Sequence, residues 1–226
     1  MHSVQIDQYE ALLCEKKRRI ETQFSRFTHP NLEVFSSPKK HFRQRAEFKI
    51  WHTENRCFHA MFERGSNNSP IEITDFPIAS EAIVQLMPKL LAELNQDDEL
   101  KRRLFQVEYL NTLSGEMLVT LIYHRKIGDE WVAAAKSLKE KLGIHIIGRA
   151  KKMRILLDQD HVIETLQIDD KQFHYKQIEG GFTQPNAYVN QHMLSWARSC
   201  AEGSKGDLLE LYCGNGNFSI ALADKF

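Results

Sequence analysis

Two stretches of this sequence hold residue types whose spacing can support chemistry. The first is "LYCGNGNFS", which follows an apolar run and places Gly214 and Gly216 where a strand would turn into a helix. Glycines in such a turn let the backbone approach a ligand and direct helix N–H groups toward it. The dinucleotide pattern G-x-G-x-x-G is incomplete, because Ser219 stands at its third glycine. Spacing alone leaves two interpretations open, a cofactor site and a plain strand-to-helix connection.

The second stretch is "RQRAEFKI", in which apolar and charged residues alternate with the period of a half-buried strand. Its outward face is a basic stripe that contains one acid: Arg43, Arg45, Glu47 and Lys49. Such a stripe can contact phosphates, whereas a carboxylate repels phosphate but accepts a hydrogen bond from a base edge. A salt bridge from Glu47 to Arg45 or Lys49 explains the same pattern equally well.

The composition is that of a soluble globular protein, with 42% hydrophobic and 27% charged residues among 226. No apolar run approaches the roughly 20 residues that span a bilayer, and the start of the chain lacks the order of a signal peptide. The four cysteines form no C-x-x-C pair, which argues against a zinc or iron–sulfur site and for a reducing, cytoplasmic setting. Thirty basic residues balance thirty acidic ones, so any nucleic-acid binding must rest on local patches.

Other elements must position these two stretches, and hydrophobic periodicity predicts most of them. We expect helices at residues 7–27, 79–94 and 128–143, and a loop followed by a helix within residues 182–203, with Pro185 near the first turn of that helix. We expect strands at residues 42–51, 56–64, 104–114, 116–125, 144–158, 161–168 and 173–181. The apolar run 208–212 should be a buried parallel strand in front of the glycine turn. This order predicts a mostly antiparallel α+β domain over 1–180 and the beginning of a Rossmann-like α/β domain over 181–226.

The helix ends are predicted from capping residues. Asp7, with Glu10 three residues later, should cap the first helix, and Ser80 should cap the second. Gly143 should end the third helix. In the strand from 104 to 114, the alternation places Phe105 on the same face as the core residues Val107 and Tyr109. The fourth helix has an apolar side made of Val189, Met193, Trp196 and Cys200.

The sequence segments around the glycine turn indicate one protein family more specifically than the turn itself does. "LLELYCGNGNFS", with "FTQPN" about two dozen residues upstream, resembles the RNA uracil-5 methyltransferases, which use S-adenosylmethionine. The likeness to the tRNA (uracil-5-)-methyltransferases continues in order through "RAEFKIWH", "DFPIAS", "LFQVEYL", "LIYHRK", "HIIGRAKK" and "LDQD". The resemblance thus spans nearly the whole chain.

This resemblance implies covalent chemistry on uracil. A cysteine thiolate adds to the ring, the neighbouring carbon takes the methyl group from S-adenosylmethionine, and a carboxylate then removes the ring proton. The implied substrate is the T-loop uridine of tRNA that becomes ribothymidine, and the similar loop of transfer-messenger RNA (tmRNA). The target base must leave its stack to be reached. Members of the family work mostly as monomers, and no membrane partner is implied.

The resemblance also assigns roles to residues of this chain. It implies that Gln184, Tyr212 and Asn217 hold the cofactor, and that Gly214 and Gly216 let the backbone approach it. It implies an RNA-contacting set made of Glu47 at the flipped uracil, Phe105 stacking on unstacked bases, Arg43, Arg45, Lys49 and His124. Further RNA candidates are Arg125, Arg149, Lys151 and Lys152. By spacing alone, Tyr212 and Phe105 are core aromatics, and the basic residues are solvated surface.

The catalytic groups, a nucleophilic cysteine and a base glutamate, are expected beyond Phe226. The family's cysteine lies in a Ser-Cys-Asn-Pro segment, which does not occur here, and its base is a later glutamate. Cys213 is expected to be a packing residue. We therefore expect a C-terminally truncated chain that transfers no methyl group alone. Two other functions stay open: an RNA-binding remnant or tRNA chaperone, and a nicotinamide-dependent oxidoreductase that rests only on the glycine turn.

Overall fold

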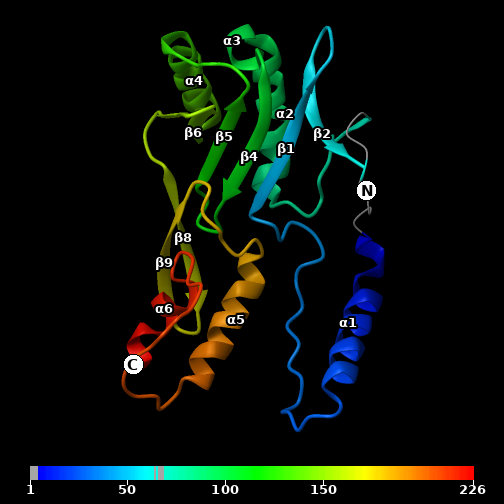
Figure 1. Ribbon diagram of the computed structural model, residues 1–226, viewed down its shortest axis with the longest axis vertical. Helices are drawn as coiled ribbons and strands as arrows, with labels where there is room; N and C mark the ends of the chain where they lie inside the picture. Colours follow the sequence, from blue (N-terminus) through cyan, green and yellow to red (C-terminus); the bar gives the residue numbers. More distant parts are fainter. Residues whose placement is uncertain (1–4, 64, 66–68) are drawn as a thin grey trace.

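The computed structural model describes residues 5–63, 65 and 69–226, and it shows a mixed α/β fold (Figure 1). The strands are β1 Arg45–His52, β2 Cys57–Phe62, β3 Pro70–Glu72, β4 Leu104–Asn111, β5 Met117–Tyr123, β6 His145–Ala150, β7 Met153–Leu156, β8 His161–Ile168 and β9 Lys171–Ile178. The helices are η1 Ile6–Gln8, α1 Tyr9–Phe24, α2 Glu81–Gln96, α3 Asp98–Lys101, α4 Asp129–Leu142, α5 Ala187–Cys200, α6 Asn217–Leu222 and η2 Ala223–Lys225. In this described part of the chain, no helix is both long and apolar enough to cross a membrane.

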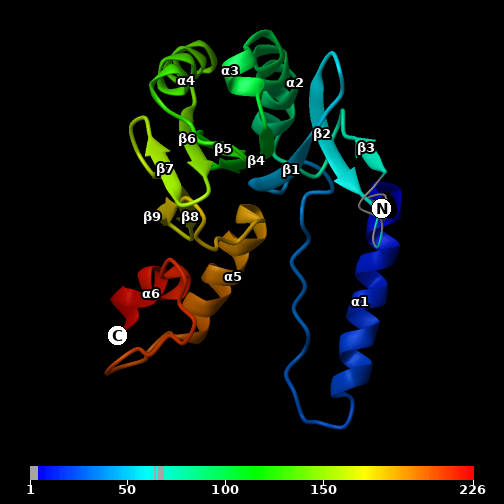
Figure 2. The ribbon, with the colours of Figure 1, turned by 45° about the horizontal axis from the view of Figure 1, so that its top comes forward.

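Seven strands form one sheet in the order β3-β2-β1-β4-β5-β6-β7. The pairs are antiparallel except β5 with β6, which run parallel and are connected through α4. A crossover helix is needed there because two parallel strands cannot be joined by a tight turn. The strands β8 and β9 form a separate antiparallel hairpin. Helices α2, α3 and α4 lie on one side of the sheet, and the hairpin and α5 lie on the other (Figure 2).

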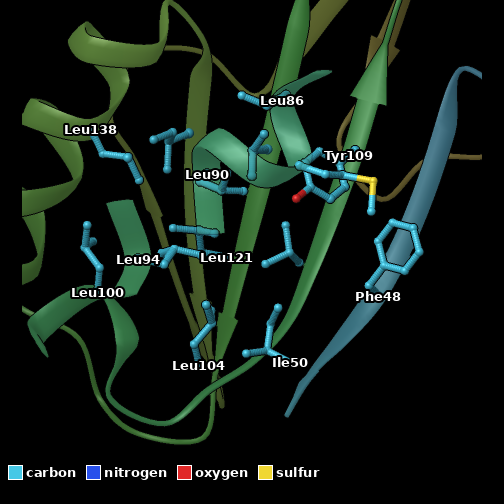
Figure 3. Close-up of a cluster of buried hydrophobic side chains, with 14 of the residues drawn as sticks. Phe48, Ile50, Leu86, Leu90, Leu94, Leu100, Leu104, Tyr109, Leu121 and Leu138 are labelled. Atoms are coloured by element: carbon cyan, nitrogen blue, oxygen red, sulfur yellow. The ribbon is translucent and has the colours of Figure 1, made fainter. Parts of the chain in front are cut away.

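The main core lies between the sheet and its helices (Figure 3). Ala46, Phe48 and Ile50, the apolar residues that alternate with the basic stripe of β1, are all buried, and so are Ile83, Met87, Leu90 and Leu94 of α2. Trp131 of α4 is fully buried, and its ring lies so near Gly148 of β6 that a Cβ there would come within 2.4 Å of it. Burial of each such side chain contributes about 1.5–3 kcal/mol, so this layer carries most of the stability.

Two of the three predicted helix ends are confirmed. The Ser80 hydroxyl accepts a hydrogen bond from the Ile83 N–H at 3.3 Å, and Gly143 ends α4 with φ of 65°. The predicted cap of the first helix is wrong. Asp7 lies within the short turn η1, so the residue before α1 is Gln8, which makes no side-chain capping bond. No residue of α1 is buried.

Two predicted strands differ from the structure. The stretch 144–158 is two antiparallel strands, β6 and β7, because the chain reverses at Lys151 and Lys152, the latter with φ of 57°. In the predicted strand 56–64, β2 ends at Phe62, and residue 64 lies outside the described residues.

The predicted parallel strand at 208–212 does not form. Leu209 and Leu211 are 81% and 71% exposed, and none of the strands in the described ranges pairs with this segment. A parallel strand is stabilised by neighbours that cover both of its faces. Without such neighbours, an apolar run stays unpaired.

The apolar side predicted for α5 is not its buried side. Trp196 is 49% exposed, whereas Ala187, Asn190, Leu194 and Arg198 are buried. The buried side of α5 packs with Leu166, Ile168 and Tyr175 of the hairpin and with Ala221 of α6. Val162 of the same hairpin packs instead against Leu110, Leu118 and Ile147 of the sheet. The hairpin therefore contacts both regions that flank the domain boundary near residue 180, a boundary that stays a prediction.

Candidate functional site

The face of the sheet opposite the helices carries polar side chains across β1 and β4, here called the open face. Pairing places Glu47 opposite Glu108 and Lys49 opposite Gln106. The side chains form a chain of contacts: Lys49 donates to Gln106, Gln106 donates to Glu108 at 2.8 Å, and Arg45 lies 4.0 Å from Glu108. The alternation seen in the sequence thus builds a continuous polar ladder across two strands.

A β-bulge changes the position predicted for Phe105. The register between β4 and β5 shifts between Leu104 and Gln106, which leaves Phe105 as an extra residue. Leu104, Val107 and Tyr109 are buried, whereas the Phe105 side chain is half-buried and lies against Lys49 of the open face. The predicted shared face with Val107 and Tyr109 is therefore wrong, because simple alternation does not survive an inserted residue.

Phe105 is the middle of a three-layer stack. The His124 ring stacks on it with centroids 3.9 Å apart and planes 20° apart, and the Lys49 ammonium lies 3.9 Å from the same ring centroid. Two groups that close cannot share one face of a ring without overlapping, so they cover opposite faces. His124 is exposed, so its outer face is open to a further planar group. Such cation–aromatic stacks are a common platform for unpaired bases.

Glu47 is exposed on the open face and is not held by its basic neighbours. Arg45 pairs with Glu108, and Lys49 donates to Gln106, so the salt bridge considered from the sequence is not formed. Beside Glu47, a hollow of about 250 Å³ lies between β1 and β2, lined also by Lys49, Met61 and Phe62. A carboxylate at the rim of a partly apolar hollow can accept a hydrogen bond from a planar polar ligand.

Arg43 and Arg45 bind the protein backbone. The Arg43 Nε donates to the carbonyl of Arg45 at 2.8 Å, and Arg45 donates to the carbonyl of Gly181 at 2.5 Å. The Gln44 N–H also donates to the carbonyl of Pro185 at 2.7 Å. These bonds fix the beginning of β1 against the loop that carries the half-buried Gln184. The structure thereby brings a predicted RNA residue and a predicted cofactor residue into one junction.

The remaining basic candidates differ in how far their charge is compensated. Arg125, with a side chain 11% exposed, lies 2.6 Å from Glu99, and Arg149 lies 2.8 Å from Glu179. Glu179 is buried, also contacts Arg154, and was not singled out from the sequence. Lys151 and Lys152 are exposed at the β6–β7 turn, which lies at the same end of the sheet as His124 because β6 runs parallel to β5. The stack and Glu47 therefore form the part of the open face best suited to a nucleic acid.

The glycine turn adopts the conformation that its residues predict. Gly214 and Gly216 have φ of 58° and 77°, which L side chains rarely adopt, and a Cβ at Gly214 would meet nothing within 4 Å. Tyr212 is fully exposed, so it is not the core aromatic that spacing suggested. The Asn217 amide exchanges two hydrogen bonds of 2.9 Å with Asn190 of α5.

Glu210 caps the helix behind this turn, and sequence reasoning missed it. Its carboxylate accepts the N–H groups of Phe218 and Ser219 at 3.3 and 2.8 Å. These are the groups that a pyrophosphate would use at a helix start, so the anion position is already filled. A ligand that carries positive charge fits beside this carboxylate better than a dinucleotide does. A carboxylate seven residues before a helix start, across a glycine turn, is the signal that could have found it.

Cys213 lies in the glycine turn, and its burial tests the prediction that it is a packing residue. Cys213 is exposed, so the prediction that it is a packing residue is wrong. The reason is the same as for 208–212, because no described strand covers this segment. Phe226 follows η2 directly and is 41% exposed. The nucleophilic cysteine and the base glutamate expected beyond Phe226 stay a prediction.

A model of the family described as tRNA (Uracil-5-)-methyltransferase matches residues 8–226. The chain is 57% identical over 221 residues to a tRNA/tmRNA (uracil-C(5))-methyltransferase of Acinetobacter baumannii (strain AYE). It is 51% identical over 228 residues to one of Chromohalobacter salexigens. These alignments cover 96% and 99% of this chain, which spans 61% of the length of each relative.

A solved structure shares the fold at low sequence identity. It is the Pyrococcus abyssi tRNA (uracil-54, C5)-methyltransferase in complex with S-adenosyl-L-homocysteine, with a TM-score of 0.67 and 18% identity. The match covers 96% of this chain and 54% of the Pyrococcus chain, which confirms the predicted fold class. The family model and the two close relatives agree over nearly all of the sequence. The chain therefore belongs to the tRNA (uracil-5-)-methyltransferase family.

Proposed function

We propose that this chain recognises RNA and contributes one edge of the cofactor site in the S-adenosylmethionine-dependent C5-methylation of uridine in tRNA and tmRNA. The target is the T-loop uridine, at the position 54 that is named for the Pyrococcus abyssi enzyme. The observation that carries the proposal is the stack of Lys49, Phe105 and His124 beside Glu47 on the open face, whose carboxylate makes no ion pair with any residue that the structure describes. Aromatic stacking and a free carboxylate suit an unstacked uracil better than a duplex.

Each of these groups has a distinct task in the proposal. The stack holds the unpaired loop, whose bases lose their own stacking partners when the target turns outward. Glu47 accepts a hydrogen bond from the ring N–H of uracil, which selects a base with a donor at that edge. The Arg45 and Gln44 bonds to the loop 181–185 keep this surface in register with Gln184.

The cofactor, S-adenosylmethionine, would supply an electrophilic methyl group. Gln184, Tyr212 and Asn217 would hold it, with Gly214 and Gly216 permitting close approach of the backbone. The fit is supported by the Glu210 carboxylate, which disfavours a pyrophosphate at α6 and favours a cationic sulfonium or ammonium group nearby. The same observation counts against the nicotinamide-dependent alternative.

We propose further that residues 1–226 transfer no methyl group by themselves. The resemblance assigns the nucleophilic cysteine and the base to segments that are not among these residues. Cys57 is buried in the core, and burial raises the pKa of its thiol, which opposes formation of a thiolate. Removal of a covalent nucleophile ordinarily costs several orders of magnitude in rate.

Binding of an unmodified tRNA transcript tests the RNA proposal directly. Phe105→Ala should weaken binding by roughly 10- to 100-fold, because it removes the ring that holds Lys49 and His124 in the stack, and one base stacked on such a platform contributes about 1–3 kcal/mol. Phe24→Ala removes an exposed aromatic residue of α1 and should leave affinity unchanged. Equal affinities for wild type, Phe105→Ala and Phe24→Ala would count against the stack as an RNA site.

Radiolabelled S-adenosylmethionine tests the chemistry. Residues 1–226 alone should give no transfer to tRNA, and clear turnover would contradict the assignment of the catalytic groups. A chimera that joins this chain to the remaining part of the Acinetobacter relative should methylate the T-loop uridine. Glu47→Gln in that chimera should lower the rate, and methylation of a tRNA without that uridine would contradict the proposed target.

A further inference from the structure

Asn190 is a buried polar residue of α5 to which none of the roles proposed above gives a function. Its amide exchanges two hydrogen bonds, both of 2.9 Å, with the amide of Asn217 at the start of α6. Each amide donates one N–H and accepts at its oxygen, so the two side chains form a closed pair. Asn190 is only 6% exposed, and a buried amide costs free energy unless its polar atoms are bonded. The pair is therefore what makes an asparagine acceptable at this position of α5.

The pair uses half of the hydrogen-bonding capacity of the Asn217 side chain. A primary amide has two N–H groups and an oxygen with two lone pairs, and Asn190 takes one N–H and one lone pair. Among the residues that the structure describes, no other group bonds to this side chain. One N–H and one lone pair of Asn217 therefore remain for a ligand, in a plane that Asn190 sets.

The backbone of Asn217 is fixed from a different element. Tyr175 of β9 is buried, and its hydroxyl donates to the Asn217 carbonyl at 3.1 Å. The hairpin thus holds the main chain of Asn217 while α5 holds its side chain. An asparagine that rotated freely would lose rotamer freedom when it bound a ligand, and an orientation set in advance avoids that cost. The contacts of Asn217 are those of a group prepared for binding.

The first turn of α5 connects two of the predicted cofactor residues. Gln184 lies in the loop directly before the helix, and the N-cap Asn186 donates to the Ser37 hydroxyl at 2.6 Å. Asn190 follows one turn later, and its N–H donates to the Asn186 carbonyl at 3.0 Å. Sites are held most precisely by side chains on helices and strands that are themselves fixed. The start of α5 therefore sets the place of Asn217 relative to Gln184.

We propose that Asn190 is a positioning residue of the cofactor site, which orients the Asn217 amide so that its remaining N–H and lone pair face a bound S-adenosylmethionine. The inference rests on the proposed function, because it needs a cofactor at the glycine turn. It goes further by assigning a task to a side chain that acts through another one. Asn190 contributes no bond of its own to the cofactor, and its effect on affinity passes through Asn217.

Titration of the full chain with S-adenosylmethionine, followed by the NMR shifts of the backbone amides of residues 212–217, measures this affinity even where it is weak. Asn190→Ala should raise the dissociation constant by about three- to tenfold, the effect of one well-oriented hydrogen bond. Asn190→Asp keeps the shape of the side chain but cannot donate to the Asn217 oxygen. It should also lose affinity, although its added negative charge by itself favours a cationic ligand. Ser195→Ala removes a different hydrogen bond of α5, to Asp169, and should leave the affinity unchanged.

A double-mutant cycle separates positioning from a purely structural role. In a chain that carries Asn217→Ala, which removes the proposed cofactor contact, Asn190→Ala should cause no further loss of affinity. A role only in the packing of α5 on α6 would lower the affinity in both backgrounds, together with the melting temperature. Unchanged affinity in both Asn190 variants, or an equal loss with and without the Asn217 side chain, would overturn the positioning role. Absence of any shift in the wild type would contradict the proposed cofactor edge itself, and the role of Asn190 with it.

Discussion

Two apolar runs of this chain have similar composition, but one forms a buried strand and the other forms none. The run 117–123, "MLVTLIY", becomes β5, with Val119 and Leu121 fully buried between β4 and β6. The run 208–212, "LLELY", forms no strand, and Leu209 is 81% exposed. The difference lies in the neighbours, since β5 has a paired strand on each side and helices over one face. An apolar run specifies a buried strand only where other elements cover it.

The same difference separates the two candidate binding regions. The candidate RNA-contacting groups stand on strands whose other face is anchored in the core, so their geometry is fixed by packing. The glycine turn is held mainly by polar contacts, from Glu210 to the start of α6 and from Asn190 to Asn217. We therefore expect substitutions in the sheet layer to act on the whole fold, and substitutions around the turn to act locally.

The largest contrast should come from two apolar deletions. Trp131→Ala leaves a large cavity between α4 and β6 and should lower the free energy of unfolding by about 3–5 kcal/mol. Leu209→Ala removes a side chain that is mostly in water and should change it by less than about 0.5 kcal/mol. Urea unfolding of both variants measures the contrast. A loss above about 2 kcal/mol for Leu209→Ala would show that the 208–212 segment is packed in solution.

The sequence predicted the sheet layer well because the patterns that indicate its strands and helices are local and mutually consistent. Alternation located β1, neighbouring apolar stretches and turn residues located β2, β4 and β5, and the caps at Ser80 and Gly143 located two helix ends. The predictions that failed depended on something beyond the local pattern. Strand 208–212 needs neighbours, and the position of Phe105 depends on a bulge, which shifts the register by one residue.

A second prediction concerns the β8–β9 hairpin, which packs against both the main sheet and α5. Glu164 of β8 is buried, and its carboxylate accepts the Leu113 N–H at 2.9 Å while its other oxygen has no partner. Burial raises the pKa of Glu164 to about 7, from an ordinary value near 4.5. The folded state therefore holds this proton where the unfolded chain has lost it. The stability from Glu164 is complete below pH 4.5 and is lost as pH rises to about 7.

Glu164→Gln removes the ionisable carboxyl group, so the difference between the wild type and this variant reports the titration of Glu164. The free energy of unfolding of the wild type minus that of Glu164→Gln should fall by about 3 kcal/mol between about pH 4 and pH 8. Burial lowers the pKa of His59 to about 4, which acts in the opposite direction, but His59 is common to both proteins and cancels in the difference. A difference that stays constant with pH would mean that Glu164 is ionised and hydrated in the folded state.

The candidate site was less accessible to sequence reasoning than the fold. The resemblance supplied residue types and roles, but not which charges are already compensated. The structure shows that Arg125 and Arg149 pair with Glu99 and Glu179. Glu47, in contrast, forms no salt bridge with Arg45 or Lys49. These pairings join residues 26 and 30 positions apart, and no local pattern encodes them. Charge compensation is a tertiary property, so it must be read from the fold.

The smallest contrast compares two helix caps. Ser80→Ala removes the cap of α2, a helix packed on the sheet, and should lower the global free energy of unfolding by about 1 kcal/mol. Glu210→Ala removes the carboxylate that caps α6 and should change the global value by less than about 0.5 kcal/mol, because α6 adds little to the core. It should nevertheless speed hydrogen exchange at the Phe218 and Ser219 amides. An equal global loss in both variants would mean that the glycine turn and the sheet unfold as one cooperative unit.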